Sequence, residues 1–409
     1  MHIGFYLNEW HRGGIAILVS RLCCELNRQG HQTTLFLERP YPKRSEGDCL
    51  SYNRYKKTVG SACVSLDLAA YPPRWRQSHL IETVLKHKVE CIFPSLYRPQ
   101  ASGFEKLSHH IPVAAIAHND HSYFYDEYVR AQFFLAAQVA PSHQIYERCR
   151  RFAPPELKSK IRHIISGITI PPKTSPPPTG PLKVIYCSRL EQTQKRSLEL
   201  PVIWKSFLSQ GGIGTLSIIG CGETGQAMRT ALADEQAAGS VRFFGHLEED
   251  EVARELQTGD IILNLANFEG FPQSVIEGTA RGMWPLLSDT ESGHREIIEL
   301  LGHGTLCPIG DKEAFARTLL DFAARIEELR QKRALIQAKA KECFNMQTCA
   351  QAYSDLAREL SATYTARPQP APFASYLPTL KERGYRLILL ARYRRAYALS
   401  WKRRHGNKE

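Results

Sequence analysis

Two glutamates set eight positions apart carry the clearest chemistry in this sequence. Glu269 lies in a tight loop, residues 268–272, and Glu277 lies in the helical run 273–281 that follows it. Carboxylates accept hydrogen bonds from hydroxyl groups, and free N–H groups at a helix start favour a phosphate or sugar oxygens. We therefore expect both glutamates to face one crevice that binds such groups.

The elements around this loop predict where the crevice lies. An apolar strand at 260–265 precedes the loop, and a second buried strand at 284–288 follows the helix. A strand, a glycine-bearing turn, a helix and a strand form the unit of a doubly wound parallel sheet. Ligands of such α/β sheets bind beyond the carboxyl ends of the strands.

The loop and helix resemble the E-x7-E signature of retaining glycosyltransferases of the GT-B fold, family four, also called glycosyl transferases group 1. Glu269 and Glu277 stand at the two glutamate positions, residues 269–272 match the E-G-F-x core, and a G-x-x-E motif follows at 293–296. The resemblance covers about residues 1–363. It implies two Rossmann-like, doubly wound parallel-sheet domains that face a cleft.

Two basic residues follow a strand predicted at 183–188. The resemblance implies that Arg189 and Lys195 donate to the diphosphate of a nucleotide sugar, where fixed cations stabilise the charge of the leaving group. Ser188 and Arg196 depart from the family pattern, which has glycine at both positions. Whether Lys195 or Arg196 reaches the phosphate therefore stays open, and a solvated basic turn is the alternative.

A histidine ends an apolar strand predicted at 112–118, which places it at the ligand edge of the first sheet. The resemblance implies that His118 lies beside the anomeric carbon; the alternative is a capping histidine satisfied by backbone groups. Asp120 and His121 either bind an acceptor hydroxyl or cap the next segment. Further strands are predicted at 138–142 and 163–167, and helices at about 15–29, with one apolar face, at 249–257 and at 312–326.

The resemblance also implies donor-binding positions. Glu277 would hold the ribose hydroxyls, and Glu269 would hold the sugar together with the amides of Gly270 to Pro272. The early glycine turn either approaches a ligand or is a plain tight turn. The donor-binding set is Gly13, Gly14, Gly220, Gly245, Gly270, Phe271, Pro272 and Glu277.

The family resemblance further implies retention at the anomeric carbon, no required metal and no cofactor, since the nucleotide sugar is a co-substrate. No second carboxylate stands out as a nucleophile. A front-face transfer assisted by the phosphate is therefore more plausible than a glycosidase-style pair of carboxylates.

Length and proline content predict the domain organisation. A chain of 409 residues is long enough for two or three domains with their own cores. A proline-rich linker at 170–181 separates an acceptor-binding domain, 1–169, from a nucleotide-sugar-binding domain, 182–345. A helix at 346–363 crosses back to the first domain, and a basic tail occupies 364–409.

Net charge and cysteine usage limit which ligands and which cellular compartment the sequence favours. The net charge of +12 suits a nucleotide sugar, an anionic lipid surface or nucleic acid, but no RRM, KH or zinc pattern supports nucleic acid. The 11 cysteines are scattered without zinc spacing, which predicts free thiols in the cytosol. No apolar stretch is long enough to span a bilayer, and the start does not read as a signal peptide.

The C-terminal tail interleaves arginine and lysine with leucine, tyrosine and tryptophan. Such a helix is typical of a membrane surface, which predicts a peripheral position on the inner face of the membrane; a solvated tail or a helix packed on a partner are the alternatives. The segment 40–55 is either a loop over the acceptor side or a disordered surface segment.

The sequence thus predicts a retaining glycosyltransferase that moves a sugar from a UDP-sugar or GDP-mannose to a saccharide or lipid-linked acceptor, in lipopolysaccharide or surface polysaccharide biosynthesis. A sugar-nucleotide epimerase of the same architecture would need no acceptor, and the E-G-F-P loop argues against it. A non-catalytic binding subunit would keep its partner after Glu269, Arg189 and Lys195 are mutated, whereas a transferase would lose turnover.

Overall fold

The computed structural model divides the chain into two units, Met1–Ile165 with the chain from Cys349 onward, and Ser166–Thr348. The predictions for the tail (366–409), the segment 40–55 and residues 172–175 of the linker lie outside the described residues. The structure describes residues 1–10, 13–39, 62–66, 68, 73–95, 101–121, 124–125, 128, 131–171 and 176–365.

The first unit contains parallel strands in the order β3-β2-β1-β4 and β5-β6-β7. A parallel bridge from Ile92 to Val113 links β4 to the chain that enters β5, so the order reads 3-2-1-4-5-6-7 and reverses between β1 and β4. The strands are β1 (His2–Glu9), β2 (Gln32–Arg39), β3 (Ala62–Ser65), β4 (Cys91–Pro94), β5 (Ala114–Ile116), β6 (Ala137–Ala140) and β7 (Ile161–His163).

Helices of the first unit bury the apolar face that the sequence predicts. In α1 (Gly14–Arg28), Leu18, Val19, Leu22 and Leu26 are buried. The other helices are α3 (Pro73–Lys86), α4 (Ala101–Leu107), α6 (His143–Phe152) and, from Cys349 on, α16 (Met346–Thr363).

The strand predicted at 163–167 is wrong in its bounds, because β7 spans Ile161–His163. Beyond it the chain changes partner: the Ile168 amide donates to the Phe344 carbonyl at 2.8 Å, and Ile168 forms a parallel bridge with Asn345. The strand predicted at 112–118 likewise shortens to β5, Ala114–Ile116.

The second unit repeats the strand order of the first. Its parallel strands lie in the order β10-β9-β8-β11-β12-β13, which reverses between β8 and β11. This is the order of a Rossmann-type sheet, and the reversal is where such sheets bind ligands. The strands are β8 (Leu182–Cys187), β9 (Gly214–Ile219), β10 (Val241–Gly245), β11 (Ile261–Asn264), β12 (Trp284–Ser288) and β13 (Thr305–Cys307).

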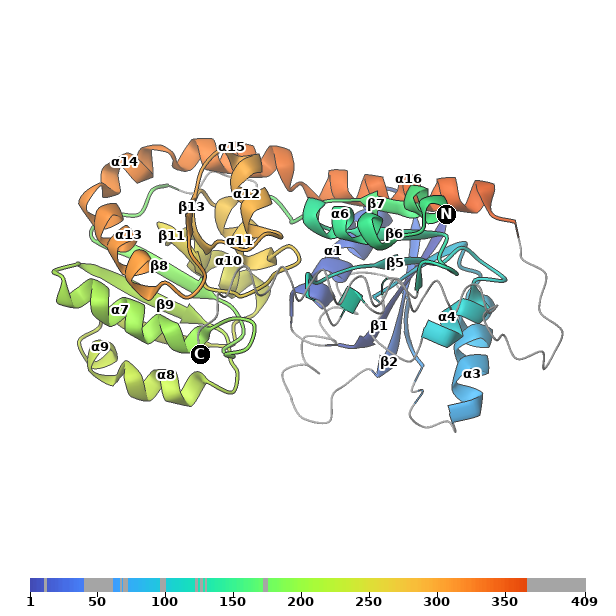
Figure 1. Cartoon of the computed structure of the whole chain (residues 1–409), viewed down its shortest axis with the longest axis horizontal. Coiled ribbons are helices and arrows are strands. Elements are labelled where there is room, and N and C mark those ends of the chain that lie inside the picture. The colour runs from blue at the N-terminus through green and yellow to red at the C-terminus, as the bar shows by residue number, and fades with distance from the viewer. Residues whose placement is uncertain are drawn as a thin grey trace. The chain divides into compact units, whose positions relative to one another are not determined.

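Helices cover both faces of this sheet, as doubly wound folds require. Within the second unit, α7 and α13 pack together on one face, whereas α10 contacts α11 and α15 contacts α11 and α12 on the other (Figure 1). The helices are α7 (Leu200–Ser209), α8 (Gly225–Ala231), α9 (Ala233–Ala237), α10 (Glu249–Gln257), α11 (Gln273–Thr279), α12 (His294–Leu301), α13 (Lys312–Ala324), α14 (Ile326–Gln331) and α15 (Arg333–Cys343).

Two helices differ from their predicted lengths for local reasons. The helix predicted at 273–281 ends at Thr279, and the turn after it needs Gly282, whose φ is +79° and where a Cβ would lie 2.7 Å from the Arg333 carbonyl oxygen. The helix predicted at 312–326 breaks at Arg325, whose φ of −115° and ψ of 31° are not helical.

A buried aspartate fixes the two strands that flank the reversal in the second sheet. Asp260, just before β11, accepts from the Lys183 amide of β8 at 3.0 Å and from two Arg330 nitrogens at 3.0 Å each. Asp260 and Arg330 are both buried. A shift of β8 against β11 would break these hydrogen bonds and leave a buried charge without its partner, which is strongly unfavourable. The cluster therefore holds the two strands in register.

Candidate active site

Two loops at the reversal of the second sheet are joined by hydrogen bonds. One follows β8 and the other follows β11. The Asn267 amide donates to the Gln194 carbonyl at 2.7 Å, and the Asn267 side chain donates to the Thr193 carbonyl at 2.7 Å. The Gln194 side chain donates to the Phe268 carbonyl at 3.1 Å. The two loops therefore form one rigid edge beyond the strand ends.

Glu191 organises the first of these loops. Its carboxylate accepts from the Gln194 amide at 3.1 Å and from the Lys195 amide at 3.0 Å. The Tyr186 hydroxyl donates to the Lys195 carbonyl at 3.3 Å. These contacts hold the backbone of Lys195 from both sides, so the direction of its side chain is set by the loop.

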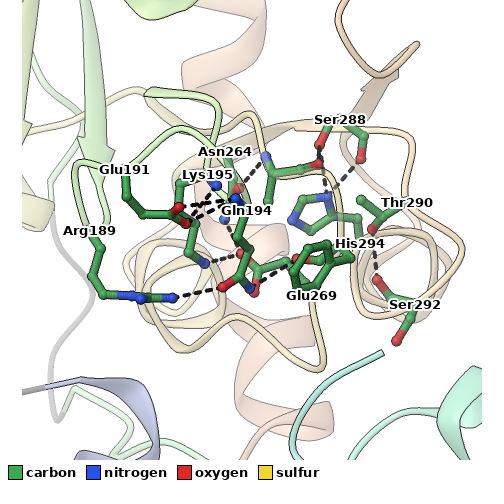
Figure 2. Close-up of polar contacts among 12 residues, drawn as sticks. Arg189, Glu191, Gln194, Lys195, Asn264, Glu269, Ser288, Thr290, Ser292 and His294 are labelled. Carbon is green, nitrogen blue, oxygen red and sulfur yellow. Dashed lines mark hydrogen bonds and ion pairs between the residues drawn. The ribbon is translucent and has the colours of Figure 1, made fainter. Parts of the chain in front are cut away.

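Lys195 and Glu269 form a buried ion pair (Figure 2). Lys195 Nζ donates to Glu269 Oε1, and the side chains are only 12% and 6% exposed. Asn264 Nδ2, at the end of β11, donates to the same oxygen at 3.3 Å. Burial alone would raise the pKa of Glu269, but Lys195, His294 and the Asn264 hydrogen bond together lower it below its usual value. Glu269 is therefore a carboxylate, ready to accept hydrogen bonds.

Arg189 and Glu277 lie at the same strand ends. The exposed Arg189 donates from Nη2 to Gln194 Oε1 at 2.7 Å, and Gln194 in turn reaches the loop of Glu269 (Figure 2). Burial, together with a smaller contribution from the charge of Glu277, raises the pKa of the Cys187 thiol to about 12. Half-buried Glu277 therefore lies near the end of β8, so the structure brings Arg189, Lys195, Glu269 and Glu277 together.

Arg196 points elsewhere. Its guanidinium binds the Glu199 carboxylate and donates to Asn267 Oδ1 at 2.9 Å. Its φ of +51° and ψ of 35° are left-handed, the conformation that glycine adopts most readily. Lys195 and not Arg196 therefore faces Glu269, and Arg196 occupies a backbone conformation that glycine would adopt readily.

Glycines after β9 let its loop lie against the loop after β8. A Cβ on Gly220, whose φ is +134°, would lie 1.9 Å from the Ser188 carbonyl oxygen, and one on Gly222 would lie 2.1 Å from the Leu190 carbonyl oxygen. The Gly220 amide donates to the Gly245 carbonyl at 2.7 Å. Gly220 and Gly245 thus let the chain at the ends of β8, β9 and β10 lie side by side.

The loop residues 270–272 pack inward. Buried Phe271 meets Phe344 edge to face, with ring centroids 5.7 Å apart, and the Gly270 carbonyl accepts from Ser292 Oγ at 3.3 Å. The prediction that amides of Gly270 to Pro272 bind the sugar needs correction, because proline has no N–H. Gly270 and Phe271 carry the only backbone donors among these three residues.

Sequence reasoning missed His294, the first residue of α12, although it lies inside the G-x-x-E motif that it singled out. His294 is fully buried, and its Nδ1 lies 2.7 Å from the Ser288 carbonyl oxygen. A carbonyl only accepts, so Nδ1 carries the hydrogen. Asn264 and Gln194 were also missed, since a single amide in a loop gives no periodic or motif signal.

The first unit presents a neutral pair at its own strand ends. Ser95 follows β4, and its hydroxyl lies 2.8 Å from Nε2 of His118, which follows β5. Burial lowers the pKa of His118 to about 4, so the imidazole is neutral at pH 7. The partner found for the ring is a side-chain hydroxyl, whereas the capping alternative expected backbone groups.

Other candidates in the first unit have structural contacts. Asp120 is buried, pairs with Arg148 and accepts from the Tyr125 hydroxyl at 2.9 Å, which leaves it little capacity for an acceptor sugar. Gly13 is the N-cap of α1 and has no side chain to cap it, and Gly14 is the first residue of that helix.

Neither a metal site nor a membrane span is found in the part of the chain that the structure describes. No cluster of three or more histidine, cysteine, aspartate or glutamate side chains there could hold a metal ion. No helix among the same residues combines the length and apolar character that crossing a bilayer requires.

Comparisons with known proteins show that much of the second unit is similar to one family. Residues 171–341 match the family model described as "Glycosyl transferases group 1", as the motifs predicted. The chain is 33% identical over 147 residues to the amylovoran biosynthesis glycosyltransferase AmsK of Erwinia amylovora, covering 34% of this chain and 35% of that one. It is 28% identical over 179 residues to the putative colanic acid biosynthesis glycosyltransferase WcaL of Salmonella typhimurium, covering 42% and 43%. The aligned parts thus span less than half of either relative.

A solved structure confirms the fold over a longer stretch. The Anabaena protein Alr3699/HepE, crystallised with UDP and glucose, aligns with 88% of this chain and 100% of its own length, with a TM-score of 0.70 and 14% identity. At that identity the likeness concerns the fold. The predicted α/β, GT-B architecture with two Rossmann-like sheets is therefore confirmed.

Proposed function

We propose that this chain, whose residues 171–341 match the family model of the group 1 glycosyl transferases, is a retaining glycosyltransferase of family four that uses a nucleotide sugar. The observation that carries this is the buried Lys195–Glu269 pair at the reversal of the second sheet. It combines a cation for a diphosphate with a carboxylate for sugar hydroxyls at the edge where doubly wound sheets bind ligands.

The leaving group would be a nucleoside diphosphate. As the glycosidic bond breaks, negative charge grows on the diphosphate, and cations already in place stabilise it without reorganisation. Lys195 sits on a backbone fixed by Glu191, and exposed Arg189 is steered by Gln194. The loop therefore keeps both cations next to the carboxylates that would hold the sugar and the ribose, Glu269 and Glu277.

The hydrogen bonds that Glu269 accepts favour front-face transfer over a mechanism in which the sugar becomes covalently attached to Glu269. Glu269 Oε1 already accepts from Lys195 and Asn264, which lowers its nucleophilicity and suits a hydrogen-bond acceptor. Detection of a glycosyl group covalently attached to Glu269 by mass spectrometry would overturn front-face transfer.

The names of the similar proteins support a proposal for the donor and the acceptor. The Anabaena structure holds UDP and glucose, which favours a UDP-sugar over GDP-mannose. AmsK and WcaL are named for amylovoran and colanic acid biosynthesis, which favours a surface polysaccharide and a saccharide or lipid-linked acceptor. We further propose that the enzyme works in the cytoplasm at the inner face of the membrane and requires no metal.

A two-stage experiment tests the function. First, the full chain is screened by thermal shift against UDP- and GDP-sugars, since a ligand that binds the folded state raises its melting temperature. Second, the best donor is incubated with and without a saccharide acceptor, and sugar transfer and free nucleotide are measured. Turnover only with acceptor, with retained anomeric configuration, supports the proposal. Isomerisation or hydrolysis of the donor without acceptor would instead favour an epimerase.

A further inference from the structure

His294 holds an unused base beside the ion pair. Its Nδ1–H donates to the Ser288 carbonyl at 2.7 Å, so Nε2 is a bare lone pair. That atom is buried and has no hydrogen-bond partner. Figure 2 shows the ring with Nδ1 turned to Ser288 and the other nitrogen turned toward the Lys195–Glu269 pair. A buried polar atom without a partner is rare and calls for an explanation.

The proposed function makes two demands on Lys195. In this structure its Nζ neutralises Glu269, and during transfer the same Nζ would have to neutralise the donor diphosphate. If Nζ moves to the phosphate, Glu269 keeps one hydrogen bond from Asn264 and becomes a buried charge without a partner of opposite sign. Such a charge is strongly unfavourable unless another cation replaces the first.

The charged groups around His294 favour that replacement. Burial is the main reason that the pKa of His294 lies below its ordinary value, and Lys195 lowers it further, whereas Glu269, Asp289 and the Ser288 carbonyl raise it. Withdrawal of Lys195 would therefore remove a group that opposes protonation of His294 and leave Glu269, which favours it.

We infer that His294 is a positioning residue: when a nucleotide sugar draws Lys195 away from Glu269, Nε2 of His294 takes a proton from solvent and becomes the positive partner of Glu269. This inference rests on the proposed function and extends it to a residue that does not touch the substrate. The imidazolium keeps Glu269 ionised, so that both of its oxygens continue to accept hydrogen bonds from the sugar.

Proton uptake on donor binding tests the inference. The donor selected by thermal shift is titrated into the full chain near pH 7 in buffers of different ionisation enthalpy, and the calorimetric heats give the protons bound per donor. A sugar-linked diphosphate has no group that titrates near neutral pH, so the protein must supply the change. We expect uptake approaching about one proton per donor in the wild type and its loss in His294→Asn.

His294→Asn is a matched change, because the Asn side-chain amide can still donate to the Ser288 carbonyl while the second nitrogen is gone. Its dissociation constant for the donor should rise about tenfold, since Glu269 then lacks a positive partner. His303→Asn, a half-buried histidine beside Trp284 at the opposite end of β12, is the control and should keep full uptake. In the wild type, ¹⁵N-histidine spectra should show Nε2 of His294 gaining a proton on donor binding.

The outcomes separate the two proposals. If no nucleotide sugar binds, the proposed function fails and His294 has no role to play. If a donor binds and is turned over without proton uptake, Lys195 stays on Glu269 and the inference about His294 is overturned alone. Uptake that persists in His294→Asn would assign the proton to Glu269 itself and would overturn it as well. Should His294→Asn not fold, the ¹⁵N spectra of the wild type decide.

Discussion

The two sheets of this protein share one strand order but differ in the charge at their reversal points. In the second unit, Lys195 and Glu269 are ionised, buried and joined. In the first unit, His118 and Ser95 form a neutral pair, because burial lowers the pKa of the imidazole to about 4. The same backbone topology therefore supports one site suited to a charged ligand and one suited to a ligand that carries hydroxyl groups.

The difference shows that topology decides where a site lies and the loop residues decide what it binds. In the second unit the relevant side chains follow the two strands that flank the reversal, β8 and β11. In the first unit they follow β4, which borders the reversal, and its neighbour β5. A diphosphate requires fixed cations, whereas a neutral imidazole can accept a hydrogen bond from a hydroxyl. Variants that remove charge should therefore affect the two sites very differently.

The largest effect is expected for Lys195→Ala in the charged site. Loss of the cation should lower kcat/KM for sugar transfer by roughly 10³-fold, as loss of a preorganised donor does elsewhere. It also leaves Glu269 buried without its partner, so the free energy of unfolding should fall by about 3 kcal/mol. Transfer assays and urea denaturation measure both. The control Lys205→Ala removes a lysine from a surface pair with Glu235 and should change neither; an active Lys195→Ala would refute the assignment.

Glu269→Gln keeps the shape of the side chain and removes its charge. We expect kcat/KM to fall by about 10²-fold, because a neutral amide holds sugar hydroxyls and Lys195 less well. The variant should also change acid stability. The pKa of Glu269 is lowered on folding, so its contribution is present above the ordinary pKa of about 4.3 and is lost as pH falls through the lower folded value. Melting temperatures of both proteins from pH 6 to pH 3 should converge at the acid end, and parallel curves would contradict this.

His118→Gln tests the neutral site by its pH dependence. Because the folded pKa of about 4 lies below the ordinary value of about 6.5, the neutral ring contributes stability above pH 6.5 that is lost as pH falls toward 4. Between pH 7 and pH 5 the wild type should lose roughly 1–2 kcal/mol of unfolding free energy through this residue. His118→Gln should not show this loss, and His110→Gln in the same unit is the control. Equal slopes in wild type and His118→Gln would show that the ring titrates freely.

The smallest effect concerns Arg196, the residue beside the charged site that does not face it. Arg196→Ala and Arg196→Gly both lose the contacts to Glu199 and Asn267, but glycine adopts the φ of +51° without strain. The glycine variant should therefore be more stable than the alanine variant by about 1 kcal/mol in urea denaturation. Sugar transfer by Arg196→Gly should stay within about threefold of the wild type, since Lys195 is the residue that faces Glu269. A hundredfold loss would restore Arg196 as the phosphate ligand.

Much of the fold follows from the sequence because its signals are local. The strand at 284–288 and the helix at 249–257 have the predicted bounds, since apolar runs and capping residues are visible within a few positions. The motif residues Glu269 and Lys195 were also assigned from a local pattern. Their meeting in an ion pair needed the fold, because 74 positions separate them.

The rest depends on contacts between distant segments. Nothing near residues 163–167 shows that the chain leaves the first sheet there and pairs with Asn345. The sequence also gives no sign that Nε2 of His294 lacks a partner. The tautomer of the ring depends on a carbonyl six residues away, and the isolation of Nε2 depends on burial. A role for an amide such as Asn264 can be recognised only when the fold shows the carboxylate to which it donates, here Glu269.

Gly222 carries a practical consequence for anyone who would re-engineer this protein. It is exposed, and surface positions are ordinarily the first to be altered, yet any side chain there would collide with the Leu190 carbonyl oxygen. A library that diversifies outward-facing residues without regard to backbone spacing would thus push Leu190 and its neighbour Arg189 out of place. Variants at Gly222 would then lose turnover, and an activity screen would not show that the cause is a shifted loop.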